Sequence, residues 1–588
     1  MDDRLARVES AVHELAASVA RIERRLTAIE QIASHLPVQA FASDLPADPA
    51  LPAHPGRSVH PALPAPDLVT LLSFTGRTFV VLGGAYLLRA LTDASIIPLP
   101  QGTAVGLAYA MCWLVMSDRA AGANRRTSAG FHGLVAAMIA FPLIWESVVR
   151  FQLLTSNGAA IALALVTALI LVAALRQRSQ LLAWIAVIAA LATSLAAVAA
   201  TRVVLPFAAV TIALGIATLW LGYSADWVLL RWPTALVADL MVLALTIRVA
   251  GGSWPDPPGA VIALQLVLVT GHLGSVAART LLRGRDVNLF EIVQTAGVLA
   301  VGFGGAMYVA RITGHGAAPI AAMNLVVGAG CYGVAFAFLA RLRDLRRNFY
   351  FYTSLGLILV LVSTALLLSG PAVALTWAVV AVVVSGLGLR TGRITLNSHA
   401  AVYVVAAAAA SGLLAAASAA LAAPAGAAWP AMGRVAVAVL MGAAACWAIP
   451  MSPAAASSPI GRIPRLAIAS VLVWSAAGWL VGLVAAALPH APNPGLDAGA
   501  LATVRTSVLA AAALALAWAG RSARWRESGW LLYPVLALGG LKLLVEDLPR
   551  SQPATLFIAL AAYGGALIVA PRVARARSSG VPHHEAPT

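Results

Sequence analysis

The only lysine of this 588-residue sequence, Lys542, lies in an apolar stretch together with Glu546 and Asp547. A charged side chain at membrane depth costs at least ~2.5–3.5 kcal/mol unless it is compensated. The spacing of four residues places Lys542 and Glu546 on one face of a helix, although lysine before glutamate is the weaker order for such a pair. Two interpretations stay open: an ion pair that fixes the rotation of the helix, or a polar site.

Three further charged residues, Arg77, Arg89 and Asp93, lie where the apolar part of the chain begins. Arg77 and Arg89 flank the first apolar run, and an arginine at the outer end of a helix runs against the positive-inside trend. An acidic neighbour such as Asp93, an anionic lipid or an anionic substrate would explain Arg89. We therefore count all three as candidates for the polar site.

Glu146, Arg150 and Asp239 are secondary candidates. Glu146 and Arg150 have the favourable order for a pair four residues apart, which predicts an interfacial ion pair. Asp239 lies about two turns inside another apolar run without a charged partner on the same run, so it needs a partner elsewhere or a proton. Four uncharged polar residues are predicted to form hydrogen bonds between helices, namely Gln265, His272, Gln294 and Asn324.

The sequence offers no nucleotide, metal or catalytic motif. A phosphate-binding loop requires Gly-Lys followed by Ser or Thr, whereas Lys542 lies in Leu-Lys-Leu-Leu. Gly328, Gly330 and Gly333 have the spacing of a dinucleotide fingerprint but lie within an apolar run, so we expect them to serve helix packing. We expect no cofactor, no metal and no catalytic residue, and we favour a role that is not enzymatic.

The composition excludes a soluble fold. Hydrophobic residues make up 61% of the chain and charged residues 11%, against roughly 25% charged in an ordinary soluble domain. The net charge of +16 comes from 38 arginines and one lysine against 23 acidic residues. Because the arginines are scattered in small groups between apolar runs, we interpret them as topology signals and expect no nucleic-acid partner.

Eighteen apolar runs of about twenty residues are each long enough to cross a bilayer as a helix. Loops on one side of these runs hold 23 arginines and loops on the other side hold six, which places both termini in the cytoplasm. The runs are 74–91, 101–117, 129–147, 157–175, 180–200, 203–222, 233–250, 259–279, 289–310, 317–340, 350–369, 371–389, 399–421, 433–450, 466–488, 500–519, 530–548 and 553–571.

The chain is thus expected to be an all-α integral membrane protein with four parts. Residues 1–36 carry a heptad repeat typical of a coiled coil, through which residues 5–36 would self-associate or bind a partner. The alternative is an amphipathic helix on the lipid surface. Residues 37–66 contain eight prolines and form a disordered linker, residues 67–571 form the transmembrane domain, and residues 572–588 form a basic cytoplasmic tail.

Two stretches resemble a known family. Residues 76–98, with Arg77, Arg89 and Asp93, resemble the first helix of a bacterial family of large polytopic membrane proteins classed as a domain of unknown function. The loop 521–526 and residues 541–548 are similar to the penultimate helix of that family, which also carries an N-terminal coiled coil and a Pro-rich linker. The middle helices match in composition only, and Arg89 stands where the family often has lysine. The resemblance implies the bacterial inner membrane and offers no established activity.

Three functions are compatible with these observations. The first is transport of a small molecule or lipid, or another form of envelope handling, through a polar site in the outer half of the bilayer. The second is a membrane scaffold organised by the coiled coil. The third, a lipid-linked transferase, is disfavoured because the short outer loops leave no room for an external domain. Membrane lipids are the expected partners in every case.

Overall fold

The computed structural model divides the chain into two units, Met1–Ser73 and Phe74–Thr588. It describes residues 76, 83–84, 90–92, 94, 96–252, 256–314, 316–338, 346–424, 429–430, 432–487 and 498–575. The predicted coiled coil (1–36), the linker (37–66), most of the first apolar run and residues 576–588 lie outside the described residues.

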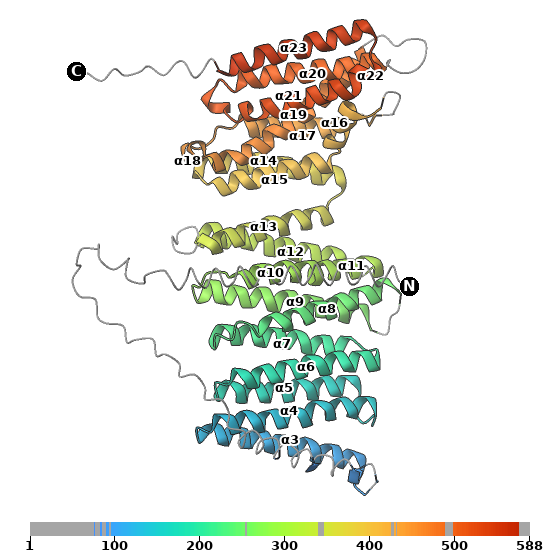
Figure 1. Cartoon of the computed structure of the whole chain (residues 1–588), viewed down its shortest axis with the longest axis vertical. Coiled ribbons are helices and arrows are strands. Elements are labelled where there is room, and N and C mark those ends of the chain that lie inside the picture. The colour runs from blue at the N-terminus through green and yellow to red at the C-terminus, as the bar shows by residue number, and fades with distance from the viewer. Residues whose placement is uncertain are drawn as a thin grey trace, which may run out of the picture. The chain divides into compact units, whose positions relative to one another are not determined.

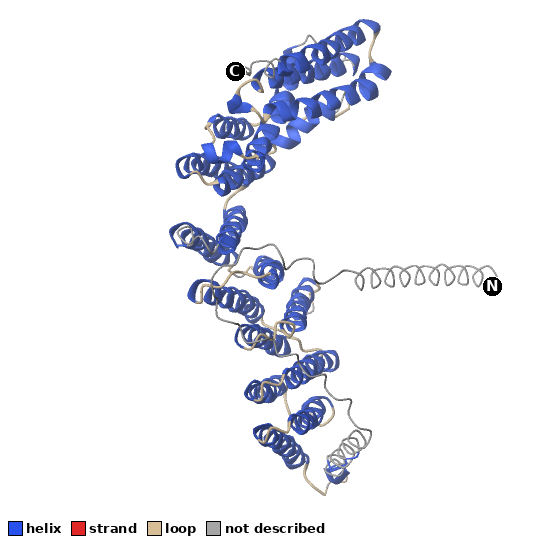
Figure 2. Ribbon diagram, turned by 60° about the vertical axis from the view of Figure 1, so that its left-hand side comes forward, coloured by secondary structure: helices blue, strands red, loops and turns tan. Residues whose placement is uncertain are grey.

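The described part of the second unit consists of helices and loops, with no strand (Figures 1 and 2). In chain order its elements are α3 (Leu99–Gly122), α4 (Arg126–Val149), α5 (Ser156–Arg176), α6 (Gln180–Thr201), α7 (Leu205–Ser224), α8 (Arg231–Ala250), α9 (Pro258–Ala277), η1 (Ala278–Leu282), α10 (Leu289–Val298), η2 (Leu299–Phe303), α11 (Gly304–Thr313), α12 (Ala317–Gly333), η3 (Val334–Phe338), α13 (Arg346–Leu367), α14 (Gly370–Thr391), α15 (Ile394–Ala410), α16 (Leu413–Ala422), α17 (Arg434–Ala448), α18 (Pro453–Ser457), α19 (Pro459–Ala487), α20 (Ala498–Ala519), η6 (Ala523–Trp525), α21 (Ser528–Lys542), η7 (Leu543–Asp547), α22 (Leu548–Arg550) and α23 (Pro553–Arg575).

Within the described residues, every apolar run predicted from residue 101 onwards coincides with one helical element or with two or three consecutive ones. Fifteen described helical spans are long and apolar enough to cross a membrane, or sixteen if the bent pair α15–α16 counts as one. The helix α17, with 15 residues, is shorter than a typical span. The protein therefore has the fold of an α-helical multi-pass membrane protein, while the count of eighteen stays a prediction.

Successive helices pack as antiparallel hairpins, such as α3 on α4, α7 on α8 and α14 on α15. Further contacts join helices that are not neighbours in the chain, including α16 with α19 and α20 with α23. Close approach depends on small residues: a Cβ atom on Gly478 of α19 would lie 2.5 Å from the Cα atom of Ala417 on α16. A Cβ atom on Gly328 would likewise lie 2.9 Å from the Cβ atom of Leu359. Gly328 thus serves helix packing as predicted, whereas Gly330 and Gly333 have no such close neighbour.

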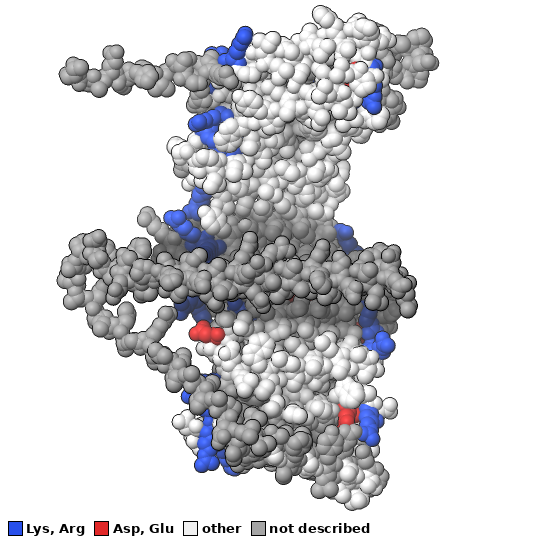
Figure 3. Space-filling model, viewed as in Figure 1, with Lys and Arg blue, Asp and Glu red and all other residues white. Residues whose placement is uncertain are grey.

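The surface of the helices suits a lipid environment. Leu165, Val326 and Phe557 are 61%, 72% and 70% exposed, and a water-soluble protein rarely exposes so continuous an apolar surface. Basic side chains gather at the two edges where the helices end, and the band between the edges is almost free of charge (Figure 3). The helices therefore expose an apolar belt to lipid and place most of their charges at its borders.

Two departures from regular helices matter for the candidate site. The predicted run 399–421 is a broken helix, because α15 and α16 are bent by 67° at Ser411 and Gly412. Gly412 has a φ of +73° at this break, a conformation that glycine adopts without steric cost. The second departure is η7, a π-helical turn at the end of α21 and one of four in the described residues, the others being η1, η2 and η3. Such turns are rare and occur often at functional sites.

Candidate functional site

The Lys542 side chain lies at the interface between α21 and α20. Its Nζ atom lies 3.3 Å from Glu546 Oε2 and 3.1 Å from Asp547 Oδ2. It also donates to the carbonyl oxygen of Ala502 at 2.8 Å and to the hydroxyl of Thr506 at 3.1 Å. The predicted pair with Glu546 is present, and Asp547 is a second partner. One ammonium group with four oxygen neighbours can shift between two carboxylates without leaving the interface.

The π turn η7 brings Asp547 to Lys542. In an α-helix, residues five apart point about 140° away from each other, so Lys542 and Asp547 would face different sides. The π turn over Leu543–Asp547 contains one more residue than an α-helical turn. It therefore brings residues five apart, such as Lys542 and Asp547, to the same side of the helix. The local geometry therefore gives Lys542 two acidic partners where a regular helix would give it one.

Asp547 is fully buried, and its two carboxylate oxygens have unequal environments. Oδ2 accepts hydrogen bonds from the Thr506 hydroxyl at 2.8 Å and from Lys542 at 3.1 Å. Oδ1 is buried and has no hydrogen-bond partner among the described residues. A buried polar atom without a partner is unusual and calls for an explanation such as a ligand, an ion or a proton.

Arg505 of α20 completes the cluster, and its side chain is 1% exposed. Its Nη1 atom lies 2.7 Å from Glu546 Oε1, while Nε and Nη2 donate to the carbonyl oxygens of Ala420 and Ala423 at 2.7 Å each. These carbonyls belong to the end of the broken helix α16, where the helix dipole favours a positive charge. Arg505 thus links the Lys542 cluster to the α15–α16 break.

The four charged groups balance, because Arg505 and Lys542 face Glu546 and Asp547. Glu546 is the most accessible member, with 16% of its side chain exposed, against 9% for Lys542 and none for Asp547. We call these four residues and Thr506 the Lys542 cluster. Chemically, it can hold a proton or a cation on a carboxylate, or bind an anionic group through the lysine, close to an accessible edge.

The other candidates from the sequence do not join this cluster within the described residues. Asp239 of α8 accepts a hydrogen bond from the Gln294 side chain of α10 at 2.9 Å, and its Oδ1 atom is buried without a hydrogen-bond partner. Glu146 lies in the last turn of α4, and Arg150 is the residue that caps that helix. Three candidates lie outside the described residues: Arg77, Arg89 and Asp93.

The predicted hydrogen bonds between helices are confirmed. Gln265 donates to Thr246 at 2.9 Å, His272 lies 3.2 Å from the Thr295 hydroxyl, and Asn324 donates to Ser363 at 2.8 Å. The fourth, Gln294, is the partner of Asp239. These residues join α8, α9, α10, α12 and α13 and so contribute to the scaffold.

A cluster around Glu291 was not expected from the sequence. Glu291 is fully buried and accepts from Arg279 Nη1 at 3.0 and 2.9 Å, one distance to each oxygen. The Tyr223 hydroxyl donates to Oε1 at 2.6 Å, and the backbone N–H of Asn288 donates to Oε2 at 2.8 Å as part of a capping box. Arg231 lies over the ring of Phe290, 4.4 Å from its centre. Both carboxylate oxygens of Glu291 therefore accept hydrogen bonds from two donors each.

A third cluster surrounds Glu527 at the start of α21. Arg462 Nη1 donates a hydrogen bond to Glu527 Oε2 at 2.9 Å, whereas Arg465 Nε lies 2.6 Å from Oε1 in an ion pair that does not have hydrogen-bond geometry. Arg465 also donates to the carbonyl oxygens of Trp447 and Ile449 at 2.7 and 3.3 Å. The arginines that the sequence analysis interpreted as topology signals include Arg279, Arg462 and Arg465, so three of them also hold buried carboxylates.

Arg505, Glu291 and Glu527 are the main residues that sequence reasoning missed. Arg505 gave one signal, because it lies within the apolar run 500–519 without an acidic residue on that run. Glu291 and Glu527 each follow an arginine-rich loop at the start of a run. An acidic residue at the start of a helix is common for reasons of capping alone, so the pattern does not by itself indicate a buried ion pair.

No family model, curated protein or solved structure matches this chain. The resemblance to a bacterial membrane family therefore stays a prediction, and the functional argument depends on the geometry alone.

Proposed function

We propose that the protein transports a small molecule or a lipid, or handles another envelope component, through the Lys542 cluster. The observation that carries this proposal is Asp547: a fully buried carboxylate that shares its lysine with Glu546 and has one oxygen without a hydrogen-bond partner among the described residues. A purely structural ion pair has no need of an unused buried acceptor, because such an acceptor costs stability. Ionisable groups within a membrane domain are by default functional candidates.

The surroundings of the cluster support transport. Discontinuous helices commonly build the binding sites of transporters, because their exposed backbone groups and helix ends can bind ions and charged substrates. Here the end of the broken helix α16 binds Arg505, and the π turn η7 positions Asp547. A change in the ion pair between Lys542 and Asp547 would thus affect two segments whose backbone departs from a regular α-helix.

The location of the cluster follows from the predicted orientation. The Lys542 cluster lies at the end of α21 that is remote from the loop 521–526, which holds three arginines. If that loop is cytoplasmic, as the distribution of arginines predicts, the cluster lies in the outer half of the bilayer. We propose a bacterial inner membrane protein with both termini in the cytoplasm.

A two-part experiment tests the proposal. Asp547→Asn and Lys542→Met should abolish complementation of a gene deletion while the protein still inserts and elutes as a single species in detergent. The matched control is Glu291→Gln, which neutralises an equally buried carboxylate outside the Lys542 cluster and should lower stability while retaining complementation. Full complementation by well-folded Asp547→Asn would contradict the proposal.

A scaffold organised by residues 5–36 is the second candidate. It is favoured by the Glu291 and Glu527 clusters, in which each buried carboxylate is paired with arginine as an internal structural contact would be. In that case deletion of residues 1–66 would abolish activity although the membrane domain still folds, and neutralising Asp547 would affect stability alone. The two candidates therefore differ in which variant is inactive.

A further inference from the structure

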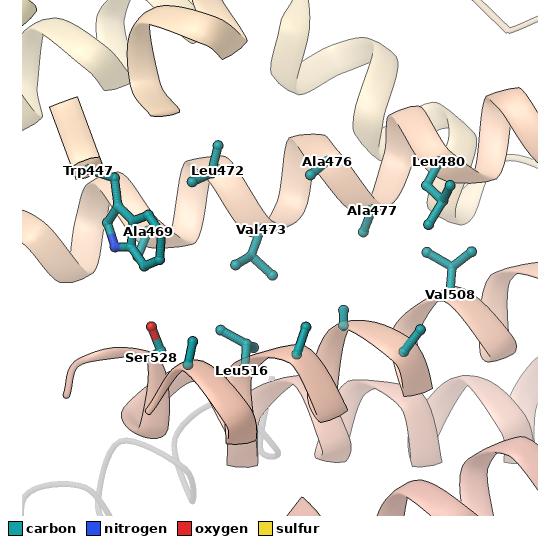
Figure 4. A pocket seen from close by; sticks show the side chains of 14 residues that line it. Trp447, Ala469, Leu472, Val473, Ala476, Ala477, Leu480, Val508, Leu516 and Ser528 are labelled. Carbon is teal, nitrogen blue, oxygen red and sulfur yellow. The ribbon is translucent and has the colours of Figure 1, made fainter. Parts of the chain in front are cut away.

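An apolar groove runs between α19 and α20 at the lipid-facing surface. It has a volume of about 370 Å³ and is lined by aliphatic side chains except for Trp447 and Ser528. Trp447 and Ser528 lie at one end of the groove, and Leu480 and Val508 lie at the other (Figure 4). Between Ala469 and Leu480, the groove follows α19 for about 16 Å at 1.5 Å per residue. It is therefore narrow, elongated and polar at one end only.

The polar end holds buried donors that lack acceptors. Ser528 is 1% exposed, its hydroxyl has no hydrogen-bond partner among the described residues, and its oxygen points into the groove (Figure 4). The indole N–H of Trp447, which lines the same end, is also buried and has no hydrogen-bond partner among the described residues, and its ring stacks on that of Trp525 with the centres 4.7 Å apart. Unpaired buried donors cost free energy, so this end of the groove is suited to a ligand rich in acceptors.

The same end carries an excess of positive charge. Glu527 is the carboxylate next to Ser528, and it faces both Arg462 and Arg465. Arg524 is exposed and donates to the carbonyl oxygen of Ala448, which is adjacent to Trp447. Two guanidinium groups thus share one carboxylate and a third, that of Arg524, has no carboxylate partner among the described residues, so the charge that would complement this end is negative.

We propose that this groove binds one acyl chain of an anionic phospholipid, with the lipid phosphate at the Ser528 end. The apolar walls match a hydrocarbon chain, and the stacked tryptophans lie where aromatic side chains commonly meet lipid headgroups. The arginines and unpaired donors match the phosphate. The lipid belongs to the leaflet on the side of the loop 521–526. This site lies at the opposite end of the α20–α21 hairpin from the Lys542 cluster, so it does not depend on the proposed function.

Photolabelling of the full-length protein tests the proposal. The protein is placed in nanodiscs of phosphatidylcholine that contain a small fraction of phosphatidylglycerol with a diazirine in its acyl chain, and the labelled peptides are mapped. We expect labelling concentrated on the groove-lining parts of α19 and α20. Unlabelled phosphatidylglycerol should compete roughly fivefold better than phosphatidylcholine, the effect of about one basic side chain near an anionic lipid. Labelling spread evenly over all lipid-facing helices would overturn the proposal.

Two variants fill the groove from opposite walls. Ala476→Phe on α19 and Ala515→Phe on α20 each place a large side chain at an exposed lining position, so neither disturbs a buried contact. Each should reduce labelling of the groove severalfold and leave labelling of other helices unchanged. Ala561→Phe, at an exposed position of α23 outside the groove, is the matched control. Unchanged groove labelling in both variants would show that the lipid does not occupy the groove.

A charge variant tests the headgroup. Arg524→Gln should remove most of the preference for phosphatidylglycerol over phosphatidylcholine while the acyl-chain labelling pattern is retained. Arg126→Gln removes the same charge at the exposed start of α4 and should leave the preference unchanged. An equal loss of preference in the two variants would overturn the assignment of the phosphate to the Ser528 end.

Discussion

The two ends of the α20–α21 hairpin hold buried carboxylates in contrasting ways. At one end, each oxygen of Glu527 lies within 3 Å of a guanidinium nitrogen of its own, from Arg462 or Arg465. At the other end, Asp547 shares one lysine with Glu546, and its second oxygen has neither an ion-pair nor a hydrogen-bond partner in the described part of the chain. The first arrangement has one stable pairing, whereas the second has alternatives of similar geometry. The difference teaches that burial of charge alone does not identify a site, and that a charge shared between alternative partners, as Lys542 is between Glu546 and Asp547, is the feature to test.

The largest effect on stability is expected at the Glu527 end. Glu527→Gln leaves Arg462 and Arg465 buried without a counter-charge, and breaking a buried ion pair in this way costs about 3–5 kcal/mol. We expect a large drop in thermal stability in detergent, measured by fluorescence-detected gel filtration after heating. Activity per folded molecule should be unchanged. If Glu527→Gln is fully stable but inactive, the Glu527 end has a functional role and not a structural one.

Asp547→Asn should destabilise the protein less, by about 1–3 kcal/mol. The amide keeps an acceptor for the Thr506 hydroxyl, and Lys542 keeps Glu546 as a charged partner, so the remaining cost is that of a weakened buried hydrogen bond. The same heating assay gives the difference in stability from Glu527→Gln. If both variants lose equal stability and both remain active, the ion pairs at the two ends have the same structural role.

The sequence predicted part of this contrast. The rarity of lysine and the spacing of four residues were sufficient to predict the contact of Lys542 with Glu546, because both features are local. The π turn at Leu543–Asp547 and the break between α15 and α16 were not predicted. Apolar runs with a helical period do not reveal where the backbone widens or bends, since tertiary contacts decide that. Arg505 was missed for the same reason, because its partners lie 41 to 85 residues away in the chain.

Two threonine hydroxyls of α20, those of Thr506 and Thr503, allow a test of whether the Lys542 cluster has a functional role. Thr506→Val removes the group that bridges Lys542 and Asp547, at an estimated cost of about 1–2 kcal/mol, and it should impair activity. Thr503, one turn earlier on α20, donates to the carbonyl oxygens of Gly499 and Thr555 at 2.9 and 3.0 Å. Thr503→Val is the matched control and should cost similar stability without loss of activity. Equal activity in the two variants would argue against a functional role of the bridge.

The smallest effect on stability is expected for Asp239→Asn. Asp239 has no ion pair among the described residues, and its one hydrogen bond comes from the Gln294 amide at 2.9 Å. An asparagine keeps an acceptor for that bond and removes an unpaired charge at membrane depth, which is itself unfavourable. The free energy of unfolding should therefore change by no more than about 1 kcal/mol, in either direction. Asp239 and Asp547 both have a buried oxygen without a hydrogen-bond partner among the residues that the structure describes, so a complementation assay is needed to distinguish them. We expect activity with Asp239→Asn and none with Asp547→Asn; the reverse result would move the site from the Lys542 cluster to the interface of α8 and α10.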